Sequence, residues 1–182
     1  MAIRIFNQIK PKIGKGVFVD ASAVVTGKVT LKDNVSIWPN VSIRGDLLAI
    51  TIGTNSNIQD NSVIHTTQPL TPDDKGFDTL IGDHVTVGHS AIIHGCHIGN
   101  RVLIGMGAII LDGAVIEEEV MVGAGTIVSP GKTLLSGYLY LGSPAKRIRA
   151  LSEREKQQIY KNAENYIQLK NQHICDAKAY QY

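Results

Sequence analysis

The fold is decided by IGNRVLIGMGAIILDGAVIEEEVMVGAGTIVSPGKTL, residues 98–134, in which isoleucine, valine or leucine stands at every sixth position. The same step runs through the preceding chain, at Ile13, Val19, Val25, Leu31, Ile37, Ile43, Ile52, Ile58, Ile64, Ile81, Val87 and Ile93. This period is the signature of a parallel β-helix, a solenoid in which each hexad forms one short strand and one turn. Three hexads complete a triangular coil, and successive coils stack about 4.8 Å apart. A β-sandwich would instead show apolar residues at every second position, so the predicted fold is an all-β solenoid.

Three steps in the series are irregular. Between Ile43 and Ile52 we count one hexad plus three extra residues, which we place as a bulge at Leu47–Ile50. Between Ile64 and Ile81 we count one hexad that carries a protruding loop at 66–79, whose prolines, aspartates and glycine are typical of turns. A single-residue deletion shortens the step before Ile98. With this count, residues 1–136 form one β-helix domain.

The C-terminal part has a different pattern. Residues 137–151 form a crossover segment, in which Gly142 and Pro144 mark an irregular turn. Ser152 with Glu155 three residues later is a capping box, which predicts a helix over 152–175. Its apolar residues recur at helical spacing on one narrow stripe. We therefore expect this helix to pack on the solenoid or on a neighbouring subunit.

Composition excludes several functions. The net charge is only +2, aromatic residues make up 5%, and the basic residues are scattered, so the chain is a poor candidate for binding nucleic acid. No apolar run approaches the roughly 20 residues of a membrane span. The first ten residues show no secretory signal, and Cys96 and Cys175 form no paired motif. We expect a cytoplasmic protein with two reduced thiols.

The repeat also assigns histidines to columns. Arg44, His65 and His94 each follow the apolar residue of their hexad, three hexads apart, and therefore stack on one face. Asp60 and His89 form a second column, on the adjoining face. Three imidazoles with an open fourth position are the ligand set of a catalytic zinc site. Because His89 lies on another face, the site needs a second subunit, and three-fold packing would supply one.

The same packing would bring Arg44 of one subunit towards Asp60 of another, as an interfacial ion pair. The alternative is that each histidine is an ordinary surface or hydrogen-bonded residue. The stacking of His65 on His94 requires that the 66–79 loop counts as one hexad and not two.

Several motifs resemble the γ-class carbonic anhydrase family. They are Arg-Gly-Asp at 44–46, NIQDNSVIH at 57–65 and VGHSAIIHGC at 87–96. Two others, IGMGA at 104–108 and YLYLGSPA at 138–145, are similar to the YrdA-type bacterial branch of that family. The resemblance runs from about residue 10 to 170.

The resemblance implies a left-handed β-helix and a homotrimer whose metal sites are shared between subunits. By the family pattern, His65 and His94 of one subunit and His89 of another bind the metal, which is Zn2+ with Fe2+ or Co2+ as alternatives. The implied reaction is reversible hydration of CO2 to bicarbonate by a metal-bound hydroxide. The other residues that it assigns are Gln59, Arg44, Asp46 and Asp60 as catalytic residues, and Asn57 and Tyr140 as substrate-binding residues.

Two departures from the family pattern concern proton transfer. Leu47 stands where the active members that define the family carry an acidic residue. The 66–79 loop has no glutamate, only Asp73, Asp74 and Asp78, which predicts a slow or absent proton relay. A metal-binding trimeric scaffold, a thioester hydrolase and a hexapeptide-repeat acyltransferase therefore stay as alternatives.

Overall fold

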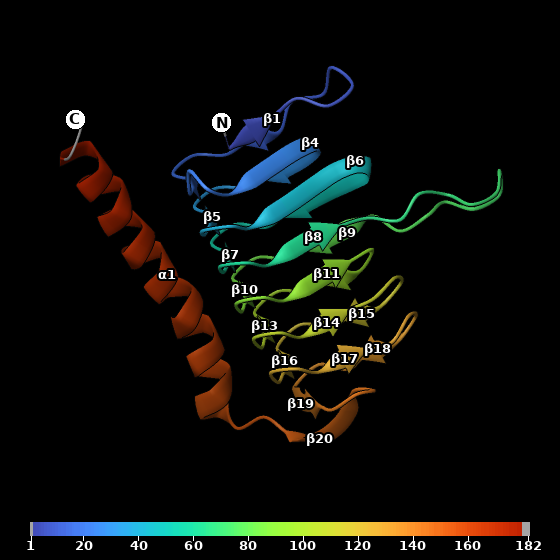
Figure 1. Cartoon of the computed structure of the whole chain (residues 1–182). Helices are drawn as coiled ribbons and strands as arrows, with labels where there is room; N and C mark the ends of the chain where they lie inside the picture. Colours follow the sequence, from blue (N-terminus) through green and yellow to red (C-terminus); the bar gives the residue numbers. More distant parts are fainter. Residues whose placement is uncertain (1, 180–182) are drawn as a thin grey trace.

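The computed structural model describes residues 2–179, and the side chains of residues 2–176. It shows a parallel β-solenoid followed by one long helix (Figure 1). The short strands stack in three columns, one for each face of the solenoid. The fold class predicted from the six-residue period is confirmed, and the left-handed winding stays a prediction from the family resemblance.

We name the three faces by what they carry. The histidine face is formed by β8 (Val63–His65), β11 (Ile92–His94), β14 (Ile109–Ile110) and β17 (Ile127–Val128). The helix face is formed by β3 (Phe18–Val19), β5 (Ser36–Ile37), β7 (Asn57–Ile58), β10 (Thr86–Val87), β13 (Leu103–Ile104), β16 (Met121–Val122), β19 (Tyr138–Leu141) and β20 (Lys146–Ala150). The third face is formed by β2 (Lys12–Ile13), β9 (Thr79–Ile81), β12 (His97–Ile98), β15 (Val115–Ile116) and β18 (Thr133–Leu134).

Two long strands, β4 (Val24–Leu31) and β6 (Ser42–Ile52), run along both the histidine face and the third face. β1 (Ile3–Arg4) pairs with the start of β4. These long strands join the two faces into one 12-stranded sheet, whereas the helix face is a separate 8-stranded sheet.

The register of the strands follows the apolar spacing. On the histidine face the partners are Val25, Ile43, Ile64, Ile93, Ile110 and Val128. On the third face they are Ile13, Leu31, Ile52, Ile81, Ile98, Ile116 and Leu134. From Val25 onwards these side chains are at most 2% exposed and form the core. Counting the 66–79 loop as one hexad is therefore confirmed.

The bulge lies almost where the sequence places it. Gly27 pairs with Gly45 and Val29 pairs with Ile50, so residues 46–49 stand opposite Lys28 alone. Ile50 is fully buried and back in register. Its inclusion in the bulge was wrong, because its side chain belongs to the core.

The segment expected as a crossover has strands of its own. β19 continues the helix face as one more rung, and β20 pairs with it antiparallel. The chain then enters α1 (Glu153–Ala179), which runs back along the helix face (Figure 1). The predicted capping box is present, since Ser152 Oγ accepts from the Glu155 N–H at 3.3 Å and the Ser152 N–H donates to Glu155 Oε2 at 2.9 Å.

Aromatic side chains attach α1 to the helix face. Trp38 is 6% exposed, and its ring lies 5.5 Å from Tyr166 and 5.1 Å from His173, both edge-on. Nearer the middle of the solenoid, His84 stacks on Tyr160 with ring centroids 4.9 Å apart. The predicted packing of the helix on the solenoid is thus seen within one chain. In residues 2–179 we find no helix that combines the length and apolar character needed to cross a membrane.

Candidate metal centre

His65 and His94 lie side by side on the histidine face. They end strands β8 and β11, and the two residues are register partners in the parallel pair. Their ring centroids are 5.2 Å apart, and their side chains are 13% and 31% exposed. The predicted stacking of these two histidines is confirmed.

Each ring has one nitrogen bonded to a carboxylate. His65 Nε2 lies 3.0 Å from Asp46 Oδ1, and His94 Nδ1 lies 2.7 Å from Asp112 Oδ1. The remaining nitrogens, Nδ1 of His65 and Nε2 of His94, face each other at 3.2 Å. An ionised carboxylate only accepts hydrogen bonds. With both N–H groups directed at the acids, two lone pairs would be left opposite each other, and a cation between them would relieve their repulsion.

The donor set fits a divalent metal ion. Two nitrogens bound tetrahedrally at 2.0–2.1 Å are roughly 3.3 Å apart, close to the 3.2 Å observed. A carboxylate behind each imidazole is the usual support of a histidine ligand, since it fixes the tautomer and orients the ring. Within residues 2–179 no group of three or more histidine, cysteine or acidic side chains is placed to hold a metal. On this face the described residues thus bring together two imidazoles, His65 and His94, and no third histidine.

Asp46 owes its position to the bulge in β6. It is the first of the extra residues, and its second oxygen, Oδ2, accepts from the Arg44 guanidinium. Burial alone would raise the pKa of Asp46, but the hydrogen bonds from Arg44 and His65 outweigh it and lower that pKa below its ordinary value. Asp46 is therefore ionised at neutral pH, and its Oδ1 is placed to accept a hydrogen bond from His65 Nε2.

The remaining predicted residues lie at the helix face. His89 Nδ1 is 2.9 Å from Asp60 Oδ2 on the preceding coil, so these two residues stack as predicted. Gln59 Nε2 donates to Asn57 Oδ1 at 3.2 Å, and Asn57 Nδ2 donates to Thr86 Oγ1 at 2.9 Å. One chain thus presents two half-sites on different faces, which it does not bring together.

Tyr140 belongs to neither half-site. It is 4% exposed, continues the apolar column of the helix face one coil after Val122, and its hydroxyl accepts from the Leu135 N–H at 2.8 Å. The structure places it in the core of the last coil. The expected approach of Tyr140 to a pocket between subunits stays a prediction.

Asp112 and Thr67 also lie at this site and were not predicted from the sequence. Asp112 follows Ile110 by two residues, one coil after His94, and Thr67 Oγ1 donates to Asp112 Oδ2 at 2.9 Å. Asp112 could have been predicted from the repeat. It lies two residues after the buried Ile110, and His94 lies one residue after the paired Ile93, so the two side chains fall close together on adjacent coils. Thr67 carried no such signal, because it lies in the irregular segment after His65.

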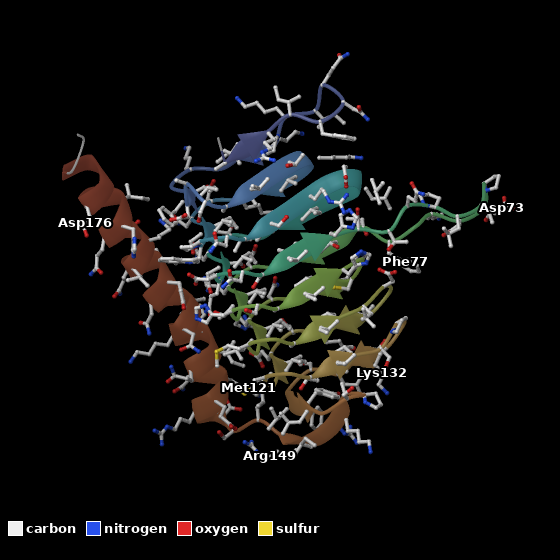
Figure 2. All side chains as sticks on the ribbon, viewed as in Figure 1. Asp73, Phe77, Met121, Lys132, Arg149 and Asp176 are labelled. Carbon is white, nitrogen blue, oxygen red and sulfur yellow. The ribbon has the colours of Figure 1, made fainter. Side chains whose placement is uncertain are left out.

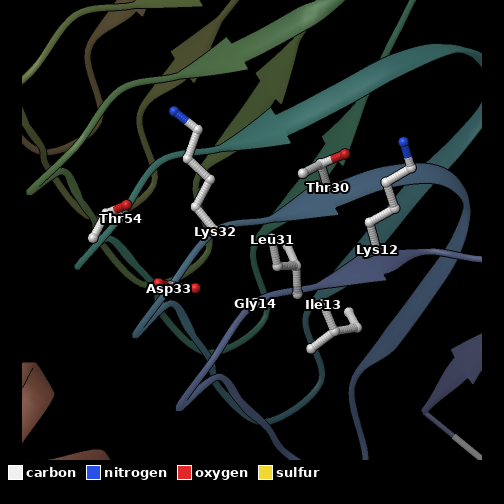
Figure 3. Close-up of a pocket in the computed structure, with 8 residues that line it drawn as sticks. All are labelled: Lys12, Ile13, Gly14, Thr30, Leu31, Lys32, Asp33 and Thr54. Atoms are coloured by element: carbon white, nitrogen blue, oxygen red, sulfur yellow. The ribbon is translucent and has the colours of Figure 1, made fainter.

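A further histidine–aspartate pair, a buried cysteine and a surface hollow lie outside the two half-sites. His97 Nε2 pairs with Asp78 at 2.8 Å on the third face. Cys96 is in the core, where burial raises the pKa of its thiol to about 12. A hollow of about 340 Å³ lies between β2 and β4 (Figure 3), and the eight described residues that line it include no predicted site residue.

Fold and repeat define the class of protein. The family "Bacterial transferase hexapeptide (six repeats)" matches residues 10–45 and 95–130, so this is a hexapeptide-repeat protein. Protein YrdA of Escherichia coli is 49% identical over 94% of each chain. A "probable carbonic anhydrase" of Methanocaldococcus jannaschii is 44% identical over 86% of this chain and 94% of its own length. The chain belongs to the γ-carbonic anhydrase family, in its YrdA-type branch.

A solved structure of a hexapeptide-repeat protein has the same fold. The crystal structure of a hexapeptide transferase family protein from Anaplasma phagocytophilum is 40% identical and superposes with a TM-score of 0.86. The match covers 92% of this chain and 95% of that one, so the two proteins share the solenoid and nearly its full length.

Proposed function

We propose that this protein is a metal-dependent, carbonic anhydrase-like enzyme that hydrates CO2 reversibly to bicarbonate. The site consists of His65 and His94 of one subunit and His89 of a neighbouring one. The observation that carries the proposal is the opposed nitrogen pair of His65 and His94, 3.2 Å apart with a carboxylate behind each ring. The kinship with proteins named as carbonic anhydrases supports the choice of reaction.

A divalent metal held by the three histidines would supply the nucleophile, because it would lower the pKa of a water molecule there to about 7, the value for the zinc site of carbonic anhydrase itself. Zn2+ is our first choice, with Fe2+ or Co2+ as alternatives, because imidazole suits all three.

The chain's own residues hold and orient this group. Asp46 and Asp112 keep the metal-facing nitrogens of His65 and His94 unprotonated, and Asp60 does the same for His89 by bonding its Nδ1. We assign Arg44 to the subunit contact and the orientation of Asp46. The buried amides of Gln59 and Asn57 support CO2 and bicarbonate, since they come from the same half-site as His89.

A homotrimer completes the site. Apart from Ser42, the residues just before the buried column of the histidine face are apolar, and Val63 and Ile92 there are 41% and 38% exposed. They lie two residues from His65 and His94 on the same strands. An exposed apolar stripe beside a half-site is typical of an interface, and closed three-fold symmetry builds three equivalent sites from one pair of surfaces. A cytoplasmic location is part of the same proposal.

We expect the transfer of a proton from the site to solvent to limit the rate of this enzyme. Figure 2 shows Asp73 at the outer end of the protruding segment. Asp74 accepts from the N–H groups of Leu70 and Gly76, which hold its pKa below the ordinary value and make it a poor base. We therefore expect slow turnover that rises steeply with the concentration of external buffer.

The test combines metal content, assembly and activity. Purified protein should carry about one metal per subunit, and His89→Ala should lose most of it while staying folded. His97→Ala is the matched control, since His97 pairs with Asp78 away from both half-sites. Stopped-flow CO2 hydration is then measured on zinc- and iron-loaded protein. Full metal retention in His89→Ala would contradict the shared site.

A second candidate is an acyltransferase. It is favoured by the match of the chain to a transferase repeat family. Saturable binding of acetyl-CoA, with no metal bound, would support it over our proposal. Bound metal with no CO2 hydration would instead favour a scaffold or a thioester hydrolase, which a thioester cleavage assay separates.

A further inference from the structure

The stem of the protruding segment 66–79 is a closed structure. Thr67 and Phe77 exchange backbone hydrogen bonds in both directions, at 3.0 and 2.8 Å. Phe77 lies where the segment leaves the solenoid, far from Asp73 at its outer end (Figure 2). The position of Thr67 is therefore fixed by the stem and does not depend on the outer end.

The stem is also bonded to the backbone beside both histidines. The Thr79 hydroxyl donates to the His65 carbonyl oxygen at 2.6 Å and accepts from the Gly95 N–H at 3.0 Å. Gly95 directly follows His94. Both ends of the segment thus meet the strands that carry the histidine pair.

The Thr67 side chain completes a chain of hydrogen bonds to His94. Its hydroxyl donates to Asp112 Oδ2 at 2.9 Å, while Asp112 Oδ1 accepts from His94 Nδ1 at 2.7 Å. Both carboxylate oxygens of Asp112 are therefore engaged, which holds the carboxylate plane in one orientation.

We infer that Asp112 and Thr67 are positioning residues for His94. Together they fix the tautomer with the proton on Nδ1, so that the lone pair of Nε2 faces His65. The inference rests on the proposed metal site, where Nε2 is the coordinating nitrogen. It gives the protruding segment a role, because its stem supplies the hydroxyl that holds Asp112. Hydrogen-bonded supports of this kind typically change metal affinity by about 10–100-fold when they are removed.

The first measurement needs no metal. In the metal-free protein labelled with 15N-histidine, long-range proton–nitrogen correlation spectra report which ring nitrogen carries the proton. We expect wild-type His94 to be protonated on Nδ1. In Asp112→Asn the amide can either accept or donate, so both tautomers of His94 should appear. Asp78→Asn is the matched control, because Asp78 holds His97 in a similar pair at 2.8 Å, and it should leave His94 unchanged.

The second measurement is metal affinity, by competition with a chromophoric chelator. Asp112→Asn should weaken Zn2+ binding about 10–100-fold. Thr67→Val should weaken it by less, and Thr67→Ser should restore it, since serine keeps the hydroxyl. Thr67→Val also tests the inference if Asp112→Asn fails to fold. Co2+-loaded protein adds a spectroscopic reading, because a displaced imidazole changes the visible absorption bands.

The outcomes separate this inference from the proposed function. Wild-type protein that binds no metal but has His94 protonated on Nδ1 overturns the function and leaves the positioning role standing. A wild-type His94 protonated on Nε2 overturns the positioning role. So does an Asp112→Asn variant with unchanged tautomer and unchanged affinity.

Discussion

The ring of Phe77 lies directly against Gly113. A Cβ at Gly113 would come within 2.9 Å of Phe77 Cε1, and the backbone there has a φ of +68°. Glycine is therefore required at this position twice over, for its backbone conformation and for the space beside it. Because Phe77 closes the stem of the protruding segment, this contact ties the segment to the coil that carries Asp112.

Gly113→Ala should loosen the stem. The positive φ alone costs about 1–2 kcal/mol for a non-glycine residue, and displacement of Phe77 adds to it. Gly131→Ala is the matched control, since Gly131 has a φ of +66° and a Cβ added there would have nothing within 4 Å. Unfolding in urea should show a larger loss for Gly113→Ala. Limited proteolysis should also cut its protruding segment faster, and equal behaviour of the two variants would rule out the role of Phe77.

Val63→Glu should dissociate the proposed trimer. Val63 lies on the histidine face two residues before His65, and a charge buried there in an interface is strongly unfavourable. Val115→Glu is the control, because Val115 is also 41% exposed but lies on the third face. Light scattering coupled to gel filtration should give monomers for Val63→Glu alone, with an unchanged circular dichroism spectrum. A trimeric Val63→Glu protein would place the interface elsewhere.

Acid should open the start of α1. The Arg149 guanidinium, with help from Ser152, lowers the pKa of Glu155 to about 2 from an ordinary 4.5. The stabilisation from this carboxylate is fully present above about pH 4.5 and is lost as the pH falls towards 2. Arg149→Gln should return the pKa of Glu155 towards 4.5 and shift the fraying of the helix to higher pH. Carboxyl 13C titration measures both, and an unchanged titration would exclude the pairing.

Lys170 should make stability rise with pH. Its side chain is only 1% exposed, and burial lowers the pKa of its ammonium below 10.5. The unfolded chain then holds this proton more tightly, so the free energy of unfolding increases as the pH rises towards 10.5. Lys170→Met should flatten that rise and keep or increase stability at pH 7. The exposed Lys161→Met, on the same helix, should leave the slope as in wild type in denaturant unfolding from pH 7 to 10.

Apolar spacing, with the 66–79 loop counted as one hexad, was enough to predict the register of the core and the histidine pair. A strand shifted by one residue would expose its buried side chain, so Ile64 and Ile93 must align, and His65 and His94 align with them. The same rule places Tyr140 in the buried phase, one coil after Val122.

The sequence did not predict how side chains are arranged at the turns between the faces of the solenoid, which we call its corners. Asp112 and Thr67 meet His94 through side chains that leave the solenoid at turns, where the six-residue period sets no direction. The bulge was predicted at the right corner, but the position of Asp46 beside His65 depends on how the extra residues fold back before Ile50.

The return of Ile50 to register indicates that a β-helix of this kind tolerates insertions at its turns. Residues 46–49 stand opposite one residue, Lys28, and yet the following coil is undisturbed. Length added at a corner is absorbed there, so segments can be lengthened, exchanged or fused to a reporter one corner at a time. Gly131, on an open turn two coils after the strand that carries His94, is a position at which to graft a foreign peptide.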